Sequence, residues 1–524
     1  MNILQLFSVL RKMKVLTPKG IFHLTASFRH NGFNVMALLD FAASVYPQHA
    51  ALVDDRESLT YQQLSIESHQ LALIFHEKYQ VKKGSKIGFL CRNHTSLVKA
   101  IFAASRLGAS LYMLNTGMSK SQIEQALGQH RFDLLIYDEE FEPVLDGAGG
   151  RKLLSYHNSR QAINRLQVVQ NRTLKKVSGS KIMLLTGGTT GKPKEVEHKQ
   201  SISRYLSPFL GLLNRLKLLD YHTAYIATPI YHGYGVAILF SFMALGKRVV
   251  ISDVFDAENA CALIRKHKVE VMTAVPLMVK KMLKVEGADL SSLSCIASGG
   301  ALLHASLVKE VSSKLGDVLY NLYGTTETGL NIIATPQDLK AEPQTLGRII
   351  DGVQLGIVNQ NKDAVVAGEV GEISLKTKNG WIGTGDLAYQ NHNGLIFLNG
   401  RKDDMIISGG ENVYPIEVEQ VLISHPQVEE VAVVGVYDED FGERLKAFVV
   451  PIEGADLTDE KLTQWLKTKV ARFQVPKEIA FIDSMPYTAV GKLDKKRLRE
   501  EYEIDYAGLL VSPTNREDDE HGNE

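Results

Sequence analysis

The chain has 524 residues, of which 44% are hydrophobic and 23% charged, the composition of a globular protein with material for a large core. Its 59 basic residues balance 59 acidic ones, so the overall charge gives no support for nucleic-acid binding, which usually needs a basic face. The length predicts about two to four domains. Three widely spaced cysteines predict a reducing compartment rather than a disulfide framework.

The N-terminal stretch mixes apolar residues with four basic residues between positions 11 and 19. No small-residue cleavage site follows its apolar start, so it does not read as a signal peptide. The longest apolar run, Val236–Leu245, is too short to span a bilayer, which takes about 20 residues. We therefore expect a cytoplasmic protein. Residues 1–30 form either a packing helix, the preferred interpretation, or a peripheral membrane contact.

From Phe41 onward, short β-rich runs alternate with helical patterns. Strands are expected, in chain order, at Lys86–Leu90, Phe132–Tyr137, Ala224–Pro229, Arg248–Ile251 and Val269–Ala274. Helices are expected at Ser96–Leu107, between the first two strands, and at Ala257–His267, between the last two. Strands that alternate with helices of about 10–15 residues predict parallel α/β sheets. In such sheets, ligands bind beyond the carboxyl ends of the strands.

Near residue 400 the pattern changes to a smaller α+β domain, after a polar, turn-prone stretch at Asn399–Asp404. Its expected elements are helices at Ile416–Ser424 and Leu462–Arg472 and strands at Val431–Val436, Arg444–Pro451 and Glu478–Ile482. We therefore predict an N-terminal segment of residues 1–30, a large domain of residues 31–401 and a small domain of residues 402–503. Residues 504–524 form an acidic tail that we expect to be disordered.

A phosphate-binding loop is predicted after the strand-like run Ile182–Leu185. Glycines let backbone amides converge on an anion, and hydroxyl and lysine side chains add donors. This phosphate loop comprises Thr186, Gly187, Gly188, Thr189, Thr190, Gly191, Lys192, Pro193 and Lys194. It is not a Walker A loop, because Thr186 stands where the first glycine is needed and Pro193 follows the lysine. Taken alone, an ordinary Gly/Thr-rich loop remains an alternative.

The phosphate loop resembles the signature of the adenylate-forming superfamily, which includes acyl-CoA synthetases, nonribosomal-peptide adenylation domains and firefly luciferase. Six further segments resemble this family's motifs in the family's order: Ser298–Leu302, Tyr323–Glu327, Thr384–Asp386, Gly400–Asp403, Ser408–Pro415 and Pro486–Lys492. The resemblance implies an α/β architecture, with a large N-terminal region and a smaller, mobile α+β C-terminal domain.

The resemblance also implies roles for single residues in binding ATP and Mg²⁺. Thr186 and Glu327 would position Mg²⁺, a cation that prefers oxygen ligands. Asp386 would accept hydrogen bonds from the ribose hydroxyls. The full implied ATP site adds to the phosphate loop Gly299, Gly300, Ala301, Tyr323, Gly324, Thr325, Thr326, Asp386 and Arg401.

The implied chemistry is attack of a carboxylate on the α-phosphate of ATP, followed by transfer of the acyl group to coenzyme A. Lys492 would neutralise charge in the first step, and Glu327 would act through the Mg²⁺ that it positions. Rotation about a hinge at Asp403 would then bring a coenzyme A-facing turn, Ser408, Gly409 and Gly410, into place.

The acyl pocket is expected at Tyr231, Tyr234, Gly235 and Val236, with His232 beside the carboxylate. A packing or capping histidine is the alternative for His232. The resemblance implies that an enzyme for amino acids would carry an acidic residue for the substrate ammonium near Gly235, and none stands there, so an amino acid is a poor substrate candidate. An apolar pocket favours a fatty or aryl acid, and we expect a fatty acid.

Three departures from the family pattern keep other functions open. The family usually has serine at Gly187 and glycine at Glu195, and it carries a longer excursion between Ile373 and Thr384. One alternative is a ligase that loads a carrier protein instead of coenzyme A. Another is a degenerate adenylate-binding protein without activity. A homodimer is also left open.

Overall fold

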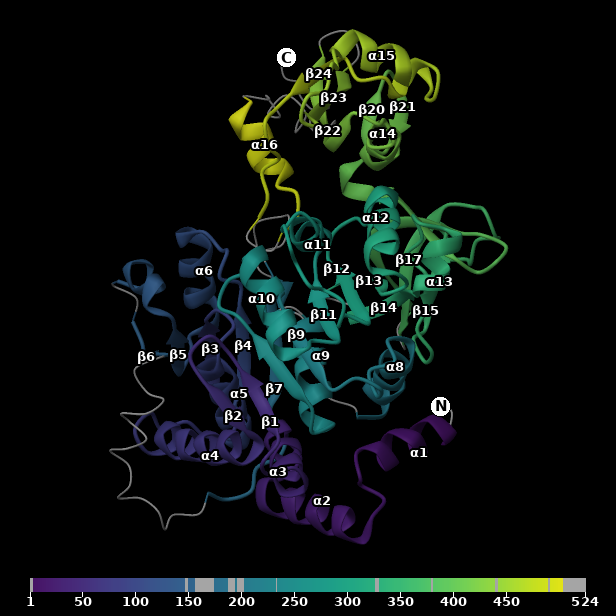
Figure 1. Ribbon diagram of the computed structural model, residues 1–524. Helices are drawn as coiled ribbons and strands as arrows, with labels where there is room; N and C mark the ends of the chain where they lie inside the picture. Colours follow the sequence, from purple (N-terminus) through teal and green to yellow (C-terminus); the bar gives the residue numbers. More distant parts are fainter. Residues whose placement is uncertain are drawn as a thin grey trace, which may run out of the picture. The chain divides into compact units, whose positions relative to one another are not determined.

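The computed structural model describes residues 3–146, 149–155, 174–186, 194–195, 202–231, 233–325, 329–377, 380–438, 442–488 and 491–502 (Figure 1). The chain divides into two compact units. The first comprises Met1–Leu355 with Ala489–Gly491, and the second comprises Gly356–Thr488 with Lys492–Glu524.

A nine-stranded sheet forms much of the first unit. Its order is β15 (Arg348–Ile349), β14 (Gly329–Ala334), β13 (Leu319–Thr325), β12 (Cys295–Gly299), β11 (Val271–Ala274), β9 (Thr223–Ile226), β10 (Arg248–Ile251), β1 (Ala50–Val53) and β2 (Ser58–Thr60). From β13 to β1, every neighbouring pair is parallel. All residues of β9, β11 and β12 are buried, as expected for parallel strands covered on both faces.

A second sheet of the first unit has six strands. Its order is β6 (Lys152–Leu154), β5 (Leu134–Tyr137), β3 (Lys86–Leu90), β4 (Ser110–Leu114), β7 (Lys181–Thr186) and β8 (Lys194–Glu195), and all but β8 are parallel. Helices α3 (Val35–Val45), α4 (Tyr61–Glu77), α5 (Thr95–Arg106) and α9 (Gly233–Ala244) share one hydrophobic cluster with strands of both sheets. Because α5 lies inside this cluster, all of its residues are buried.

The remaining helical elements of the first unit connect or flank these sheets. They are α1 (Ile3–Lys12), α2 (Pro18–Asn31), α6 (Lys120–His130), η1 (Glu139–Val144), α8 (Ile202–Arg215), α10 (Ala257–His267), α11 (Pro276–Leu283), α12 (Ala305–Leu315) and α13 (Pro336–Ala341).

The second unit contains two smaller sheets. One has the order β16 (Leu355–Val358), β17 (Gly371–Thr377), β18 (Gly380–Gln390) and β19 (Ile396–Arg401). The other has the order β21 (Glu411–Val413), β20 (Ile406–Ser408), β23 (Gly442–Pro451) and β22 (Val428–Asp438), with β24 (Glu478–Phe481) paired to β23. Its helical elements are η3 (Lys402–Asp404), α14 (Pro415–Leu422), α15 (Asp459–Lys467), η4 (Arg472–Gln474) and α16 (Lys495–Glu501).

The predicted α/β architecture is confirmed, and β3, β10 and α10 have the predicted bounds. The strand predicted at Ala224–Pro229 stops at Ile226. Beyond Ile226 the backbone is hydrogen-bonded to the side chain of Asn93, which donates to Thr228 O at 2.9 Å and accepts from the Ile230 amide at 2.7 Å.

Two further expectations were wrong in detail. The helix predicted at Leu462–Arg472 is α15, which begins at Asp459 because the Thr458 side chain caps it, and which ends at Lys467. The stretch expected to be a turn at Asn399–Asp404 instead supplies the end of β19 and the short helix η3. The predicted boundary near residue 402 lies within the second unit and stays a proposal, and the predicted tail lies outside the described residues.

Candidate functional site

Several predicted ATP-binding residues of the first unit stand at the carboxyl ends of parallel strands. Thr186 ends β7, Gly299 ends β12, and Tyr323–Thr325 ends β13. In parallel α/β sheets these ends are where ligands bind. The strand topology therefore collects segments that are far apart in the sequence into the positions expected of a nucleotide site.

The glycines of two predicted motifs are also needed by the backbone itself. A Cβ on Gly299 would lie 2.7 Å from Leu322 O, and one on Gly324 would lie 2.3 Å from Gly329 O. Gly300 has a positive φ of 82°, which a residue with a side chain rarely adopts. These positions exclude side chains whether or not a nucleotide is bound.

The predicted acyl pocket is described in part. Tyr231 is buried, its hydroxyl lies 3.2 Å from Thr116 Oγ1, and burial raises its pKa. A Cβ on Gly235 would lie 3.0 Å from Pro229 O, and Val236 packs against the main hydrophobic cluster. Packing within the protein is therefore enough to explain why a glycine stands at position 235 and a valine at position 236.

The residue that shapes the chain between β9 and α9 is Asn93, which the sequence analysis did not single out. It is buried and its side chain holds Thr228 and Ile230, just before Tyr231. An asparagine three residues after the apolar strand Lys86–Leu90 was the available signal, but nothing in that segment predicts its distant partners.

In the second unit, Asp386 and Arg401 form an ion pair. They are register partners on β18 and β19, with 2.7 Å between Asp386 Oδ1 and Arg401 Nη1. Arg401 also donates to Asp403, the predicted hinge residue, at 3.2 Å. The predicted ribose, arginine and hinge positions are thus joined by direct contacts.

Glu372 is a second residue that the sequence analysis missed. Its carboxylate accepts from the Gly385 amide at 3.2 Å, from Lys402 at 2.9 Å and from Lys362 at 3.2 Å. Burial raises the pKa of Glu372, but the hydrogen bonds from Lys402, Lys362 and Gly385 outweigh it, so the pKa is lowered. The carboxylate thereby ties the segment before Asp386 to the segment after Arg401.

The predicted coenzyme A-facing turn joins β20 to β21. Gly409 and Gly410 are exposed and have φ values of 61° and 86°, as a tight hairpin turn of type I′ requires. Ser408 is buried, and its hydroxyl donates to Phe473 O at 2.8 Å. The two glycines therefore present the surface of this turn, while Ser408 holds its base.

Lys492 lies in a narrow loop closed by two hydrogen bonds. The Thr488 amide donates to Lys492 O at 2.8 Å, and the Lys492 amide donates to Thr488 Oγ1 at 3.2 Å. Lys492 is exposed, yet partial desolvation lowers its pKa, and the charge of Arg401 lowers the pKa further, whereas Asp386 raises it. The lysine is therefore within electrostatic reach of the Asp386–Arg401 pair.

Other predicted site residues lie outside the described residues. They are Gly187, Gly188, Thr189, Thr190, Gly191, Lys192, His232, Thr326 and Glu327. Thr186, Lys194 and Tyr234 are described only as parts of β7, β8 and α9. Ala301 follows Gly300 after the end of β12.

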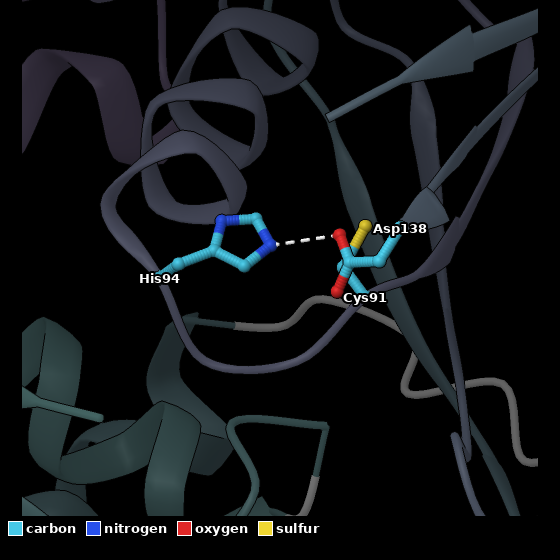
Figure 2. A group of neighbouring side chains, drawn as sticks. All are labelled: Cys91, His94 and Asp138. Carbon is cyan, nitrogen blue, oxygen red and sulfur yellow. Dashed lines mark hydrogen bonds and ion pairs between the residues drawn. The ribbon is translucent and has the colours of Figure 1, made fainter. Parts of the chain in front are cut away.

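A buried cluster of Cys91, His94 and Asp138 offers three metal-binding atoms within 4.8 Å of one another (Figure 2). Its hydrogen bonds argue against a metal. His94 Nδ1 accepts from the Leu97 amide at 3.0 Å, which leaves Nε2 to donate to Asp138 at 2.9 Å. The other Asp138 oxygen accepts from the Arg92 amide at 2.7 Å.

The remaining member of this cluster is also unsuited to metal binding. Burial raises the pKa of the Cys91 thiol well above its usual value, and the Asp138 charge raises it further. A metal would need a thiolate and would displace the hydrogen bonds of His94. The cluster is therefore a structural network that joins the ends of β3 and β5 to the start of α5. Cys261 and Cys295 are likewise buried and free.

Comparison with protein families supplies the deciding observation. A family model described as AMP-binding enzyme matches residues 39–382, and one for the AMP-binding enzyme C-terminal domain matches residues 417–492. The chain belongs to this family of AMP-binding enzymes. The expected membership of the adenylate-forming superfamily is thus confirmed.

The AMP-binding enzyme is 29% identical over 503 residues to indoleacetate–CoA ligase of Aromatoleum aromaticum, covering 88% of this chain and 97% of that protein. It is 29% identical over 486 residues to 2-succinylbenzoate–CoA ligase of Bacillus cereus, covering 86% of this chain and 97% of that protein. Among solved structures, it resembles o-succinylbenzoate CoA synthetase of Bacillus subtilis in complex with its acyl-adenylate intermediate. That structure matches at 26% identity and a TM-score of 0.77, covering 88% of this chain and 97% of the other.

The same Bacillus subtilis protein has also been solved with ATP and a magnesium ion, and that structure matches at a TM-score of 0.75 and 26% identity. The acids named in these relatives are aromatic, so the expectation of a fatty acid gains no support from them. Within the described residues, no helix has the length and apolar character to cross a membrane.

Proposed function

We propose that this AMP-binding enzyme is an acid–CoA ligase. In the first step a carboxylate attacks the α-phosphate of ATP, giving acyl-AMP and pyrophosphate. In the second, the coenzyme A thiol displaces AMP and gives the acyl-CoA. The observation that carries the proposal is the contact between Asp386, Arg401 and Asp403, with Lys492 in the field of the same charges.

In the first step two anions must approach each other, so positive charge has to be held in place before the reaction. Lys492 would neutralise the carboxylate and the α-phosphate, and Asp386 would accept from the ribose hydroxyls. Bound Mg²⁺, held by Thr186 and Glu327, would supply charge neutralisation on the phosphates. Arg401 fixes the Asp386 carboxylate and would support the ribose or phosphate side.

For the second step, the lysine has to make way for the thiol. Rotation about Asp403 would exchange Lys492 for the turn at Gly409 and Gly410. This turn suits the pantetheine arm of coenzyme A, because its exposed glycines allow close approach of a ligand.

An aryl acid is the favoured substrate class. The curated relatives and the Bacillus subtilis structure concern aromatic acids, and the segment predicted to line the acyl pocket carries the ring of Tyr231, whose hydroxyl lies beside Thr116. A fatty acid remains the second candidate, supported by the apolar segment around Val236.

The experiment that tests the acceptor offers coenzyme A and a free carrier protein in turn, with ATP, Mg²⁺ and an active acid, and identifies the thioester by mass. We expect acyl-CoA, AMP and pyrophosphate in equal amounts. Thioester on the carrier alone would replace the proposal with a carrier-loading ligase. Acid-dependent pyrophosphate without either thioester would restrict the activity to adenylation.

A further inference from the structure

Helix α2 exposes two large apolar side chains and buries two polar ones. Its side chains Ile21 and Phe22 are 52% and 67% exposed, whereas Ser27 and Asn31 are buried. Asn31 Nδ2 donates to Asp40 Oδ2 at 2.7 Å, so the polar residues anchor the helix to the first unit. In a helix that faces water, the exposed positions are usually polar. Ile21 and Phe22 are therefore largely exposed rather than packed against the described residues of the first unit.

The exposed apolar side chains continue on both sides of α2. Phe7 of α1 is 55% exposed, while Val9 of the same helix is buried in the main cluster. Leu16 is 39% exposed and Phe33 is 60% exposed. Of the fifteen large hydrophobic residues found exposed among the described residues, five lie between positions 7 and 33. Single exposed apolar residues are normal, but such a concentration marks a contact surface.

The same segment carries charge of only one sign. Residues 1–39 contain five lysines and arginines and no aspartate or glutamate. Lys12 pairs with Asp220 at 2.5 Å, and Lys14 lies over the Tyr46 ring at 4.6 Å. The other three, Arg11, Lys19 and Arg29, are exposed.

We propose that this surface, made of Phe7, Leu16, Ile21, Phe22 and Phe33 with Arg11, Lys19 and Arg29, docks the enzyme on an anionic lipid bilayer. The apolar side chains would enter the boundary between headgroups and acyl chains, and the basic residues would contact the anionic headgroups. We call it the N-terminal face, and its helices α1 and α2 lie at the purple, N-terminal end of the chain in Figure 1.

Charge decides between a bilayer and a second copy of the chain. In a two-fold dimer the same surface meets itself, so the basic residues of one N-terminal face would oppose those of the other. An anionic bilayer complements both properties of the face, its exposed apolar rings and its uniform positive charge. The family match begins at residue 39, so the face lies outside the part of the chain matched to the AMP-binding enzyme model.

The test is sedimentation of the full chain with phosphatidylcholine vesicles, with and without phosphatidylserine. We expect binding that needs phosphatidylserine and weakens as salt is added. The double variants Ile21→Ser/Phe22→Ser and Lys19→Glu/Arg29→Glu should each weaken binding about tenfold or more. Val254→Ser removes a side chain that is equally exposed, at 55%, outside the face, and should bind like the parent chain.

All variants should keep the parent's ligase activity in the absence of vesicles, which checks that they are folded. Equal binding by the parent, both double variants and Val254→Ser would overturn the proposal, as would a parent chain that ignores phosphatidylserine. Loss of a dimer in Ile21→Ser/Phe22→Ser, measured by sedimentation velocity, without any vesicle binding by the parent would assign the face to a second copy instead.

Discussion

Asp386 and Arg401 are paired across neighbouring strands, and their carboxylate and guanidinium groups approach to 2.7 Å. This pair fixes the carboxylate proposed to bind the ribose, and it places a positive charge near Lys492. The second unit alone thus holds three of the residues proposed for the adenylation step.

The first prediction concerns Asp386→Asn. It removes the charge that would accept hydrogen bonds from the ribose hydroxyls, and it leaves Arg401 with only Asp403 of its two carboxylate partners. Because a hydrogen bond to a charged group contributes about 1.5–3 kcal/mol, we expect the KM for ATP to rise by about tenfold to a hundredfold. The measurement is acid-dependent ATP–pyrophosphate exchange at varied ATP. Asp456→Asn, which alters an exposed ion pair with Lys461, is the matched control. An unchanged KM would remove Asp386 from the ATP site.

The second prediction concerns Lys492→Ala. Loss of a preorganised charge typically costs about 10²–10³ in rate, and we expect this loss in adenylation, with transfer from preformed acyl-AMP to coenzyme A much less affected. Single-turnover assays of the two half-reactions measure it. Equal losses in both half-reactions would contradict the assignment of Lys492 to the first step.

The pH dependence of adenylation gives Lys492 a second signature. Its pKa is lowered by desolvation and by Arg401, so the ammonium loses its proton at a lower pH than an ordinary lysine. Because the charged form is the active one, adenylation should decline on the alkaline side as the pH rises through this lowered pKa. Lys492→Arg should move the decline to higher pH, since arginine keeps its charge. A profile that is the same in both proteins would refute this source of the decline.

The third prediction concerns Glu372→Gln. An amide keeps the shape of the side chain but weakens its contacts with Lys402, Lys362 and the Gly385 amide. We expect lower ATP affinity, because the segment before Asp386 loosens, and slower thioester formation, because Lys402 adjoins the hinge. The assays are ATP titration and transfer from acyl-AMP. A stability loss with both steps unchanged would make Glu372 purely structural.

The fourth prediction concerns Asp138→Ala in the buried cluster. It leaves the Arg92 amide, His94 Nε2 and Ser155 Oγ without their acceptor, and each buried unsatisfied group costs about 1–3 kcal/mol. The free energy of unfolding in urea should fall accordingly, whereas the exposed Asp456→Ala should leave it unchanged. Zinc-specific chelators should not alter the parent. Activity or stability lost with chelator and restored by zinc would establish a metal site here.

The same cluster also predicts a loss of stability in acid. Burial raises the pKa of Asp138, but hydrogen bonds from His94, Ser155 and Arg92 outweigh it, so the pKa in the folded protein is lowered. The contribution of Asp138 to stability is therefore present above its pKa in the unfolded chain. It is lost as the pH falls through its pKa in the folded protein. The free energies of unfolding of the parent and of Asp138→Ala, measured in urea, should therefore converge as the pH falls.

The sequence predicted local structure well where one segment carries the whole signal. The apolar runs of β3 and β10 and the amphipathic pattern of α10 have the observed bounds. Glycines 299, 300 and 324 could be singled out because their motifs are contiguous in the chain, and the backbone needs glycine there, whereas their part in binding ATP stays a prediction.

Contacts between residues far apart in the chain could not be predicted from the sequence. Glu372 was missed, since its partners Lys362, Gly385 and Lys402 come from three separate segments of the chain that only the fold brings together. Ser408 was assigned to coenzyme A by its motif, but its hydroxyl is held by Phe473 O, which lies 65 residues along the chain.

The most direct test of the proposed ligase is acid-dependent ATP–pyrophosphate exchange across a panel of short, long-chain and aryl carboxylates, followed by addition of coenzyme A. The account predicts exchange with at least one aryl acid and a coenzyme A thioester that forms when coenzyme A is added. Exchange confined to long-chain acids would keep the ligase and move its substrate to the fatty acids. No exchange with any acid, from a folded protein that binds ATP, would contradict the proposed chemistry and favour an adenylate-binding protein without activity.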